Sequence, residues 1–290
     1  MKRGAGCPAC RAESHLGFSV RFPPPHWAYT NSEVPTAFTT AALTMLFALS
    51  AQAQWFNYPT PGLPRTPDGK VDLSAPVPRT PDGHPDLSAL WQPAVGGADP
   101  QFLDIAREVK EGLPLQPWAA DLIKARREEL NKDDPDGHCK PLGPVKMHLH
   151  PYPRKMFQLP GVVLILFERE TTYRQIFTDG RPHPVDPNPT FNGYSVGRWD
   201  GDTLIVETIG IKDGLWLDIS GTPLTDAAKV TERYRRPAFG TLEIDVTIDD
   251  PKAYTKPWSI RINQSLAADT EMLEFYCIEN EKDVPHLVGK

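Results

Sequence analysis

From Lys155 onward, apolar and polar residues alternate along the chain with a period of two, which is typical of half-buried β-strands. The clearest run is TLEIDVTIDD, in which apolar side chains occupy every second position from Leu242 to Ile248. Asp200-Gly201 is predicted to be the type I′ turn of a hairpin. Eight strands are predicted, in the segments 161–168, 172–177, 194–199, 202–208, 229–236, 241–250, 258–263 and 271–278.

These strands follow one another with short turns and without intervening helices, so a parallel βαβ sheet is excluded. The order favours a mainly β fold, either an up-and-down antiparallel barrel or a strongly curled sheet of lipocalin-like shape, because closure removes exposed edges. A β-sandwich is the alternative arrangement.

Two helices are predicted ahead of the strands. Asp99 is placed to cap the first, which starts at Pro100 and stops before Gly112, and the second begins at Pro117. The chain is accordingly divided into a leader and signal peptide, an extended arm, a helical and loop region packed on the barrel, and an antiparallel β domain. These parts cover residues 1–53, 54–89, 90–150 and 151–290.

The arm is rich in Pro, Gly and Asp, and it contains PRTPDG twice, beginning at Pro64 and at Pro78. Thr-Pro-Asp-Gly is a turn sequence, because Pro presets one backbone angle and Gly accepts a positive φ. Two short copies are too few for a solenoid. A local duplication is favoured, and residues 54–89 are a candidate contact between subunits of a homo-oligomer.

The uncharged run from Ala37 to Leu49 is followed by small residues in an A-x-A pattern that ends at Ala53. This predicts a signal peptide cleaved after Ala53 and a secreted or periplasmic protein with no stable membrane span after its removal. Cleavage also removes the CPAC sequence. Cys139 and Cys277 remain, and they are expected either to form a disulfide or to be two separate buried thiols.

The net charge of -6, with scattered Lys and Arg, makes nucleic acid an unfavourable partner. The mature chain lacks a Gly-rich phosphate loop, a G-x-S-x-G elbow, HExxH and CxxCH. Kinase, serine hydrolase, zincin and cytochrome functions are therefore disfavoured.

The proline-rich segment FTDGRPHPVDPNPTFNGY carries the densest cluster of candidate catalytic residues. His183 is a candidate general base oriented by Asp179 or Asp186, and Arg181 a candidate for stabilising an oxyanion or a carboxylate. Alternatively, the segment is a stiff loop whose charged groups satisfy one another.

A divalent metal is the candidate cofactor, and none is certain. In an extended HLH segment, His148 and His150 would project to the same side, with His183 or His138 as a third ligand. Solvated surface histidines are the alternative.

Glu232 shares a face with Val230 and Tyr234 in KVTERYRR, so it is predicted to point into the barrel. A buried carboxylate needs a partner, for which Arg174, Arg198 and Arg261 are the candidates. An internal ion pair and a catalytic carboxylate are both compatible with this placement. Four residues are candidates for substrate binding: Tyr194, Trp199, Arg174 and Arg198.

The sequences PRTPDGHPDLSALW, RQIFTDGRPHP and GYSVGRWDGDTLIVET resemble those of a family of uncharacterised secreted bacterial proteins. The resemblance covers about Pro78 to Lys290, and the chain has Ala89 where the family pattern PRTPDGxPDLSGxW has Gly. It implies secretion and a β-rich fold, and it implies no reaction. SALW is also similar in a looser way to the Gly-x-Trp that opens lipocalin-type barrels.

Together these features favour an exported, disulfide-linked β-barrel-like protein that binds a small sugar-like or aromatic molecule. As an enzyme it would be a hydrolase or lyase that uses His183 and neighbouring carboxylates. The alternative is a non-catalytic binding or surface-assembly protein that makes subunit contacts through its arm.

Overall fold

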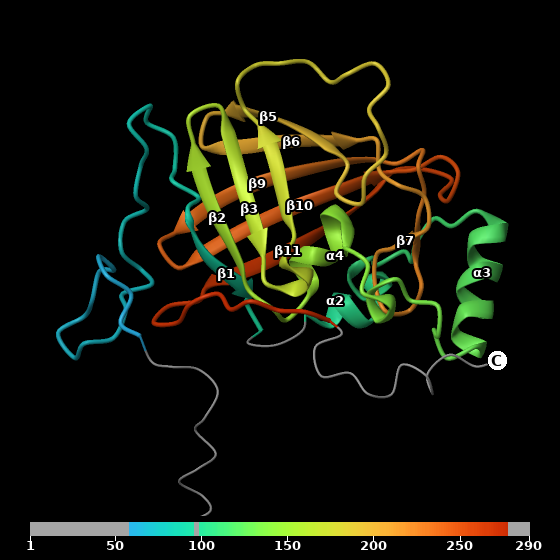
Figure 1. Cartoon of the computed structure of the whole chain (residues 1–290), viewed down its shortest axis with the longest axis horizontal. Helices are drawn as coiled ribbons and strands as arrows, with labels where there is room; N and C mark the ends of the chain where they lie inside the picture. Colours follow the sequence, from blue (N-terminus) through green and yellow to red (C-terminus); the bar gives the residue numbers. More distant parts are fainter. Residues whose placement is uncertain (1–57, 96–98, 278–290) are drawn as a thin grey trace, which may run out of the picture. The chain divides into compact units, whose positions relative to one another are not determined.

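The computed structural model describes residues 58–95 and 99–277, and in this part of the chain nine strands form a closed barrel (Figure 1). The mainly β fold was predicted correctly, and of the arrangements that the sequence left open the structure has the closed barrel. The barrel strands, in spatial order, are β1 (Ala89–Pro93), β11 (Trp258–Leu266), β10 (Thr241–Asp249), β9 (Lys229–Ala238), β6 (Thr203–Ile209), β5 (Tyr194–Asp200), β4 (Tyr173–Phe177), β3 (Val162–Phe167) and β2 (Arg154–Leu159). Two short strands, β7 (Leu215–Trp216) and β8 (Pro223–Leu224), pair separately.

The prediction of a wholly antiparallel barrel is wrong at one position. Strands β4 and β5 run parallel and pair only at Ile176 with Ser195 and at Phe177 with Val196. Parallel neighbours need a crossover of about a dozen residues or more. The proline-rich segment 178–193 supplies that crossover, so its length reflects the return of the chain along the barrel as well as any function.

Strand register follows the alternation of the sequence. In β10 the side chains from Leu242 to Ile248 that point inward are at most 1% exposed, as the pattern predicted. Asp200 pairs with Thr203, so the β5–β6 turn lies at Gly201-Asp202, one residue later than predicted.

The strand predicted at 271–278 is wrong, because residues 271–277 form no strand. The barrel is instead completed by β1 and β2, and β1 pairs with both β11 and β2. That closure leaves no free barrel edge onto which the C-terminal segment could add.

The helices lie mainly before β2. Asp99 caps the short α2 (Pro100–Leu103), and Asp104 caps a separate 3-10 turn, η1 (Ile105–Glu108), so the segment predicted as one helix is divided. Helix α3 (Pro117–Glu128) begins at Pro117. The sequence did not predict α4 (Gly143–Leu149), in which all seven residues are buried.

The C-terminal end of α4 reaches the interior of the barrel. Arg154 on β2 donates a hydrogen bond to the Met147 carbonyl (2.7 Å), and Gln264 on β11 donates one to the His148 carbonyl (2.9 Å). These bonds satisfy carbonyl groups that a helix end leaves without intrahelical partners. They also fix the position of the His148 side chain.

Both copies of the repeated segment form the same small turn, closed by the bridges Arg65–Val71 and Arg79–Pro85. Each arginine then forms an ion pair elsewhere on the same chain, Arg65 with Asp269 and Arg79 with Asp202 (2.7 Å). The described part of the arm therefore docks on its own chain.

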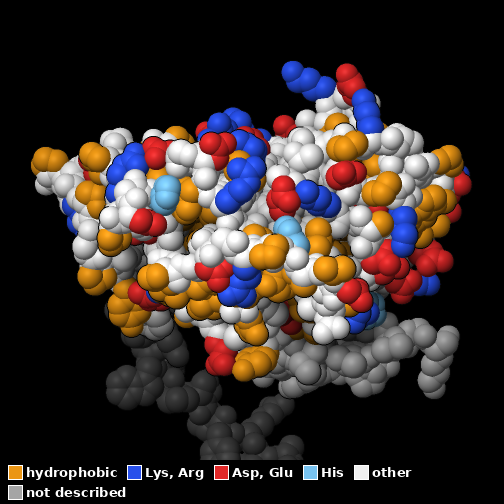
Figure 2. Space-filling model, turned by 90° about the horizontal axis from the view of Figure 1, so that it is seen from above, with side chains coloured by type: hydrophobic (Ala, Val, Ile, Leu, Met, Phe, Trp, Pro, Cys, Tyr) orange, Lys and Arg blue, Asp and Glu red, His pale blue; other side chains and the backbone are white. Residues whose placement is uncertain are grey.

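The predicted signal peptide and leader, 1–53, and arm residues 54–57 lie outside the described residues. Within the described ranges, no helix is long and apolar enough to cross a membrane. On the face shown in Figure 2, acidic and basic side chains are interspersed. Ion pairs such as Arg235–Asp245 (2.9 Å) and Lys229–Glu207 (2.9 Å) link neighbouring strands of the barrel.

Candidate functional site

A pocket of about 470 Å³ lies where β4 and β5 meet. We call it the β4–β5 pocket. The two strands share only two residue pairs, so the sheet is narrowly joined there. The residues that line the pocket come from these two strands, from the segments directly before them and, in the case of Pro141, from the segment before α4: Pro141, Thr171, Thr172, Tyr173, Arg174, Gln175, Phe177, Thr190, Phe191, Asn192, Gly193, Tyr194 and Ser195.

The walls of this pocket combine aromatic rings with polar groups. The rings of Phe177 and Tyr194 are 5.3 Å apart, and Tyr173 is 62% exposed. Asn192 donates a hydrogen bond to the Tyr173 carbonyl (3.0 Å), while its buried Oδ1 has no hydrogen-bond partner among the described residues. Ring faces beside amide and hydroxyl groups are typical of small-molecule sites.

Behind the pocket, Arg174 forms an ion pair with Glu232 inside the barrel. Arg174 Nη1 donates to Glu232 Oε1 (3.0 Å), and Nη2 pairs with Glu232 Oε2. Nε donates to Ser195 Oγ (3.2 Å), and Nη2 also donates to Thr208 Oγ1 (2.8 Å). Both charged side chains are at most 1% exposed. Sequence reasoning placed Glu232 inside the barrel and named Arg174 as one of its three possible partners.

The pair is ionised in spite of its burial. Burial by itself raises the pKa of Glu232, but the charge of Arg174 and hydrogen bonds from His148 and Arg174 outweigh it and lower that pKa to about 2. For Arg174, burial lowers the pKa and Glu232 raises it, with a net increase. The two charges thus neutralise each other.

Tyr234 and His148 extend this network toward α4. The Tyr234 hydroxyl donates to Glu232 Oε1 (2.7 Å) and lies 3.0 Å from His148 Nε2. Because its one proton is directed to Glu232, the His148 bond requires Nε2–H as the donor. Burial outweighs the attraction of Glu232 and lowers the pKa of His148 to about 4, so this histidine is neutral near pH 7.

The metal geometry predicted for His148 and His150 is wrong, because His148 lies in the last turn of α4 rather than in an extended segment. His150 Nδ1 accepts a hydrogen bond from the Tyr152 amide (3.3 Å). Of the candidate third ligands, His138 Nε2 donates to the Lys132 carbonyl (3.0 Å). Among the described residues, the side chains close enough to share one ion are Cys139, Glu170 and Cys277, and the two sulfurs are bonded to each other.

The residues of the loop cluster predicted around His183 do not come together as one site, and none of them lines the pocket. Asp179 and Arg181 form an ion pair, and this lowers the pKa of Asp179. His183 Nε2 donates to the Glu207 carbonyl (3.0 Å) rather than to Asp179. Asp186 is exposed. The loop still adjoins the pocket, because Arg181 lies 3.9 Å above the ring of Phe177 and the ring of His183 is 6.4 Å from that of Tyr194.

Of the predicted substrate-binding residues, the structure brings Tyr194 and Arg174 together at the pocket. Arg198 is exposed on the outer face of β5, and Trp199 stacks on His84 of the arm with 4.5 Å between ring centroids. Arg261, also considered for Glu232, is paired with Asp245 outside the barrel (2.6 Å). Ser195 and Thr208 were not predicted. Thr208 could have been found as a polar residue on the face of β6 that carries Leu204 and Val206, whereas Ser195 shares its face of β5 with Gly197 and gives no such signal.

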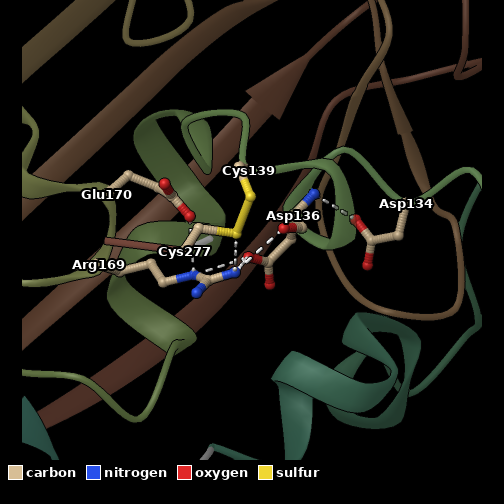
Figure 3. Close-up of a disulfide and its surroundings, with 6 residues drawn as sticks. All are labelled: Asp134, Asp136, Cys139, Arg169, Glu170 and Cys277. Carbon is tan, nitrogen blue, oxygen red and sulfur yellow. Dashed lines mark hydrogen bonds and ion pairs between the residues drawn. A yellow bond between two sulfur atoms is a disulfide. The ribbon is translucent and has the colours of Figure 1, made fainter. Parts of the chain in front are cut away.

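Cys139 and Cys277 form a disulfide, and the Glu170 carboxylate lies beside it (Figure 3). Pro141 follows Cys139 and Thr171 follows Glu170 in the sequence, and both line the pocket, as does Thr172. Arg169 lies beside the disulfide and pairs with Asp136 (2.7 Å). Figure 3 shows the Arg169 guanidinium next to both the sulfur of Cys277 and the Asp136 carboxylate.

No protein-family model, curated protein or solved structure matches this chain. The similarity to secreted bacterial proteins therefore stays a prediction.

Proposed function

We propose that this protein is an exported binding protein for a small molecule, and that the β4–β5 pocket holds the ligand. The observation that carries the proposal is the pocket itself, about 470 Å³ of space lined by aromatic, amide and hydroxyl groups. Ligand pockets are typically about 300–1,000 Å³. The buried ion pair keeps the floor of the pocket in one conformation.

The chemistry of the lining favours an uncharged ligand with a ring. Arg174 is the single charged residue in the lining, and Glu232 neutralises it. Tyr173, Phe177 and Tyr194 offer ring faces for a sugar or an aromatic group, and Asn192 and Thr190 offer hydrogen bonds to its hydroxyl groups. A sugar-like or aromatic compound satisfies both requirements.

Export is supported by two independent features. The sequence from Ala37 to Ala53 has the pattern of a cleaved signal peptide, and the disulfide is a bond that persists in oxidising compartments. Amino-terminal sequencing of the protein recovered from a periplasmic extract or culture medium tests this. A chain that starts at Gln54 supports export, and one that still carries residues 1–53 contradicts it.

Binding is tested by calorimetric titration with phenyl β-glucoside, an uncharged probe that carries both an aromatic ring and a sugar. Tyr173→Ala removes an exposed ring from the pocket and should weaken binding about 10-fold, since stacking contributes on the order of 1 kcal/mol. Tyr58→Ala is the matched control, because Tyr58 is 56% exposed and does not line the pocket. Equal weakening in both variants, or no binding by the wild type, would contradict the proposal.

A hydrolase or lyase activity at the same pocket is the second candidate. It is favoured by the fixed orientation of His183, whose Nε2 is held by the Glu207 carbonyl so that Nδ1 is the basic nitrogen. The test is release of nitrophenol from neutral nitrophenyl glycosides. His183→Ala should abolish it and His138→Ala should not, whereas activity that survives His183→Ala removes this candidate.

A further inference from the structure

We propose that the Cys139–Cys277 disulfide is a thiol–disulfide exchange site, that its partner is a dithiol reductant, and that its cleavage releases one wall of the β4–β5 pocket. The functional consequence rests on the binding function proposed above. The exchange chemistry and the release of the wall do not depend on it.

The disulfide joins the segment that contains Pro141 to residues 270–277, which we call the C-terminal segment. Pro141 lies two residues after Cys139, while Thr171 and Thr172 follow Glu170, whose carboxylate lies near both sulfurs. The C-terminal segment does not itself line the pocket, but two hydrogen bonds hold it to residues 168–171 beside this wall. Leu273 N donates to Glu168 Oε2 (2.8 Å), and Thr171 Oγ1 donates to the Phe275 carbonyl (2.9 Å).

The wall is held in an unfavourable backbone conformation. Glu170 and Thr171 are consecutive non-glycine residues with φ of 61° and 46°, in the left-handed region that β-branched residues rarely adopt. Such residues persist where surrounding contacts hold them in place. Here the contacts come from the C-terminal segment, including the Phe275 ring, which lies 4.7 Å from the Arg169 guanidinium.

Charge around the sulfurs favours one direction of cleavage. Arg169 Nη2 is 3.8 Å from Cys277 Sγ, and a nearby guanidinium stabilises a thiolate. The same guanidinium also pairs with Asp136 (2.7 Å) and Glu170 (3.3 Å), which share its charge. Glu170 acts in the opposite sense, because a carboxylate oxygen lies within 4.8 Å of both sulfurs. Both cysteines are half-buried rather than part of the core. Cys277 is thus the leaving group and Cys139 the attacked sulfur.

The exchange proceeds in two displacements at sulfur. One thiolate of the dithiol attacks Cys139 Sγ, a bond forms between these sulfurs, and the bond to Cys277 breaks with its electron pair left on Cys277 as a thiolate. The second thiol of the reductant loses its proton and displaces the Cys139 thiolate, and the two cysteine thiolates then take up protons. The dithiol is oxidised to a disulfide by two electrons, and the protein is reduced.

The direction of cleavage is tested by the rate at which dithiothreitol reduces the folded protein, followed by mass spectrometry after alkylation. Arg169→Gln should slow reduction about 10-fold, because the leaving thiolate loses its cation, and Glu170→Gln should speed it several-fold. Both substitutions remove contacts around the wall, so simple loosening would speed both. Faster reduction of Arg169→Gln, or rates unchanged in both variants, would overturn the assignment.

Release of the wall is tested by amide hydrogen exchange in the oxidised protein, the reduced protein and the double variant Cys139→Ser/Cys277→Ser. Protection of residues 168–173 and 270–277 should fall at least 10-fold in the last two, while β9, β10 and β11 stay protected. Equal protection in all three, or loss of protection throughout the barrel, would overturn the proposal. Affinity for phenyl β-glucoside should also fall on reduction. If the probe does not bind the oxidised protein, the proposed binding function is wrong. The hydrogen-exchange result still decides whether reduction releases the wall.

Discussion

The two sides of the barrel are built differently. Strands β10 and β11 pair over a long antiparallel ladder, and their inward side chains are almost all apolar, among them Ile244, Val246 and Ile262. Strands β4 and β5 share two parallel pairs, and beside them the interior carries Arg174, Ser195 and other polar groups. The first side forms a continuous wall, whereas the second leaves a pocket.

The difference shows which part of the barrel interior is not explained by stability alone. An apolar interior needs no partners, whereas each buried polar group needs a hydrogen bond or an opposite charge. The polar side supplies these through the network formed by Arg174, Glu232, Tyr234 and His148. A barrel that needed only to be stable could have been apolar throughout, so the network favours a role in shaping the adjoining pocket.

The largest expected effect comes from breaking the ion pair on the polar side. Glu232→Ala leaves Arg174 buried without a counter-charge and should lower the free energy of unfolding by about 3–5 kcal/mol. Urea denaturation measures the loss. The double variant Arg174→Met/Glu232→Leu removes both charges and should recover most of that stability while altering the pocket floor. If Glu232→Ala is as stable as the wild type, the ion pair contributes nothing to the difference between the two sides.

Acid should weaken the polar side before the apolar one. The folded pKa of His148, about 4, lies below its ordinary value of 6.5. The folded state therefore binds fewer protons than the unfolded state, and stability is complete above pH 6.5 and lost as the pH falls toward 4. His150, with a pKa lowered to about 3, acts in the same direction. Between pH 7 and pH 5, each of these two histidines should lower the free energy of unfolding by about 2 kcal/mol.

His148→Gln isolates one of these contributions. The variant keeps a side-chain donor for Tyr234 but does not titrate, so it should lose about 2 kcal/mol less than the wild type between pH 7 and pH 5. Denaturant titrations at pH 7 and pH 5 measure the loss of stability in each protein. If the variant and the wild type lose the same amount, His148 is not buried in its neutral form. Glu232 adds a further loss at lower pH, between about 4.5 and about 2, because its folded pKa is lowered.

A pair of nearly isosteric exchanges compares the two sides directly. Thr208→Val removes the β6 hydroxyl that accepts a hydrogen bond from Arg174 and shares one with the Ser195 hydroxyl. Val246→Thr places a hydroxyl among apolar side chains on β10. Each should lower the free energy of unfolding by about 1–3 kcal/mol, since each leaves a buried polar group unpaired. Urea denaturation measures both variants. If either substitution leaves the stability unchanged, that side of the barrel tolerates a polar and an apolar side chain equally well.

Much of the apolar side could be predicted from the sequence, because its structure is set locally. Alternation alone places Leu242 to Ile248 on the inner face of β10, and it also turns Glu232 inward. The partner of Glu232 could be narrowed only to three arginines. The choice of Arg174 depends on which strands become neighbours across the barrel.

The features that were not predicted depend on contacts between distant residues. His148 and Tyr234 are separated by 86 positions, and nothing local indicates that they meet. Helix α4 has seven residues, all buried, so it shows no amphipathic periodicity and its HLH segment was interpreted as extended. The parallel pairing of β4 and β5 is hidden in the same way, because a long proline-rich segment is equally compatible with a functional loop.

The smallest effect is expected at the seam between β4 and β5, where Gly197 lets the strands pack closely. A Cβ at this position would lie 3.0 Å from Ile176 Cγ2 and 3.2 Å from Leu204 Cδ1. Gly197→Ala should therefore cost only about 1 kcal/mol, since side-chain ends can shift. Because Ile176 pairs with Ser195, which lines the pocket, the shift should be transmitted there and weaken phenyl β-glucoside binding more than it weakens the fold.

The matched change on the other side is Ile244→Val, which should cost about 0.5–1.5 kcal/mol and leave probe affinity unchanged. We expect the two variants to lose similar stability, but only Gly197→Ala to lose affinity for the probe. This result would establish that the seam, and not the barrel as a whole, controls the pocket. If both variants bind as the wild type does, the pocket is insensitive to the spacing of β4 and β5. The contrast between the two sides would then concern stability alone.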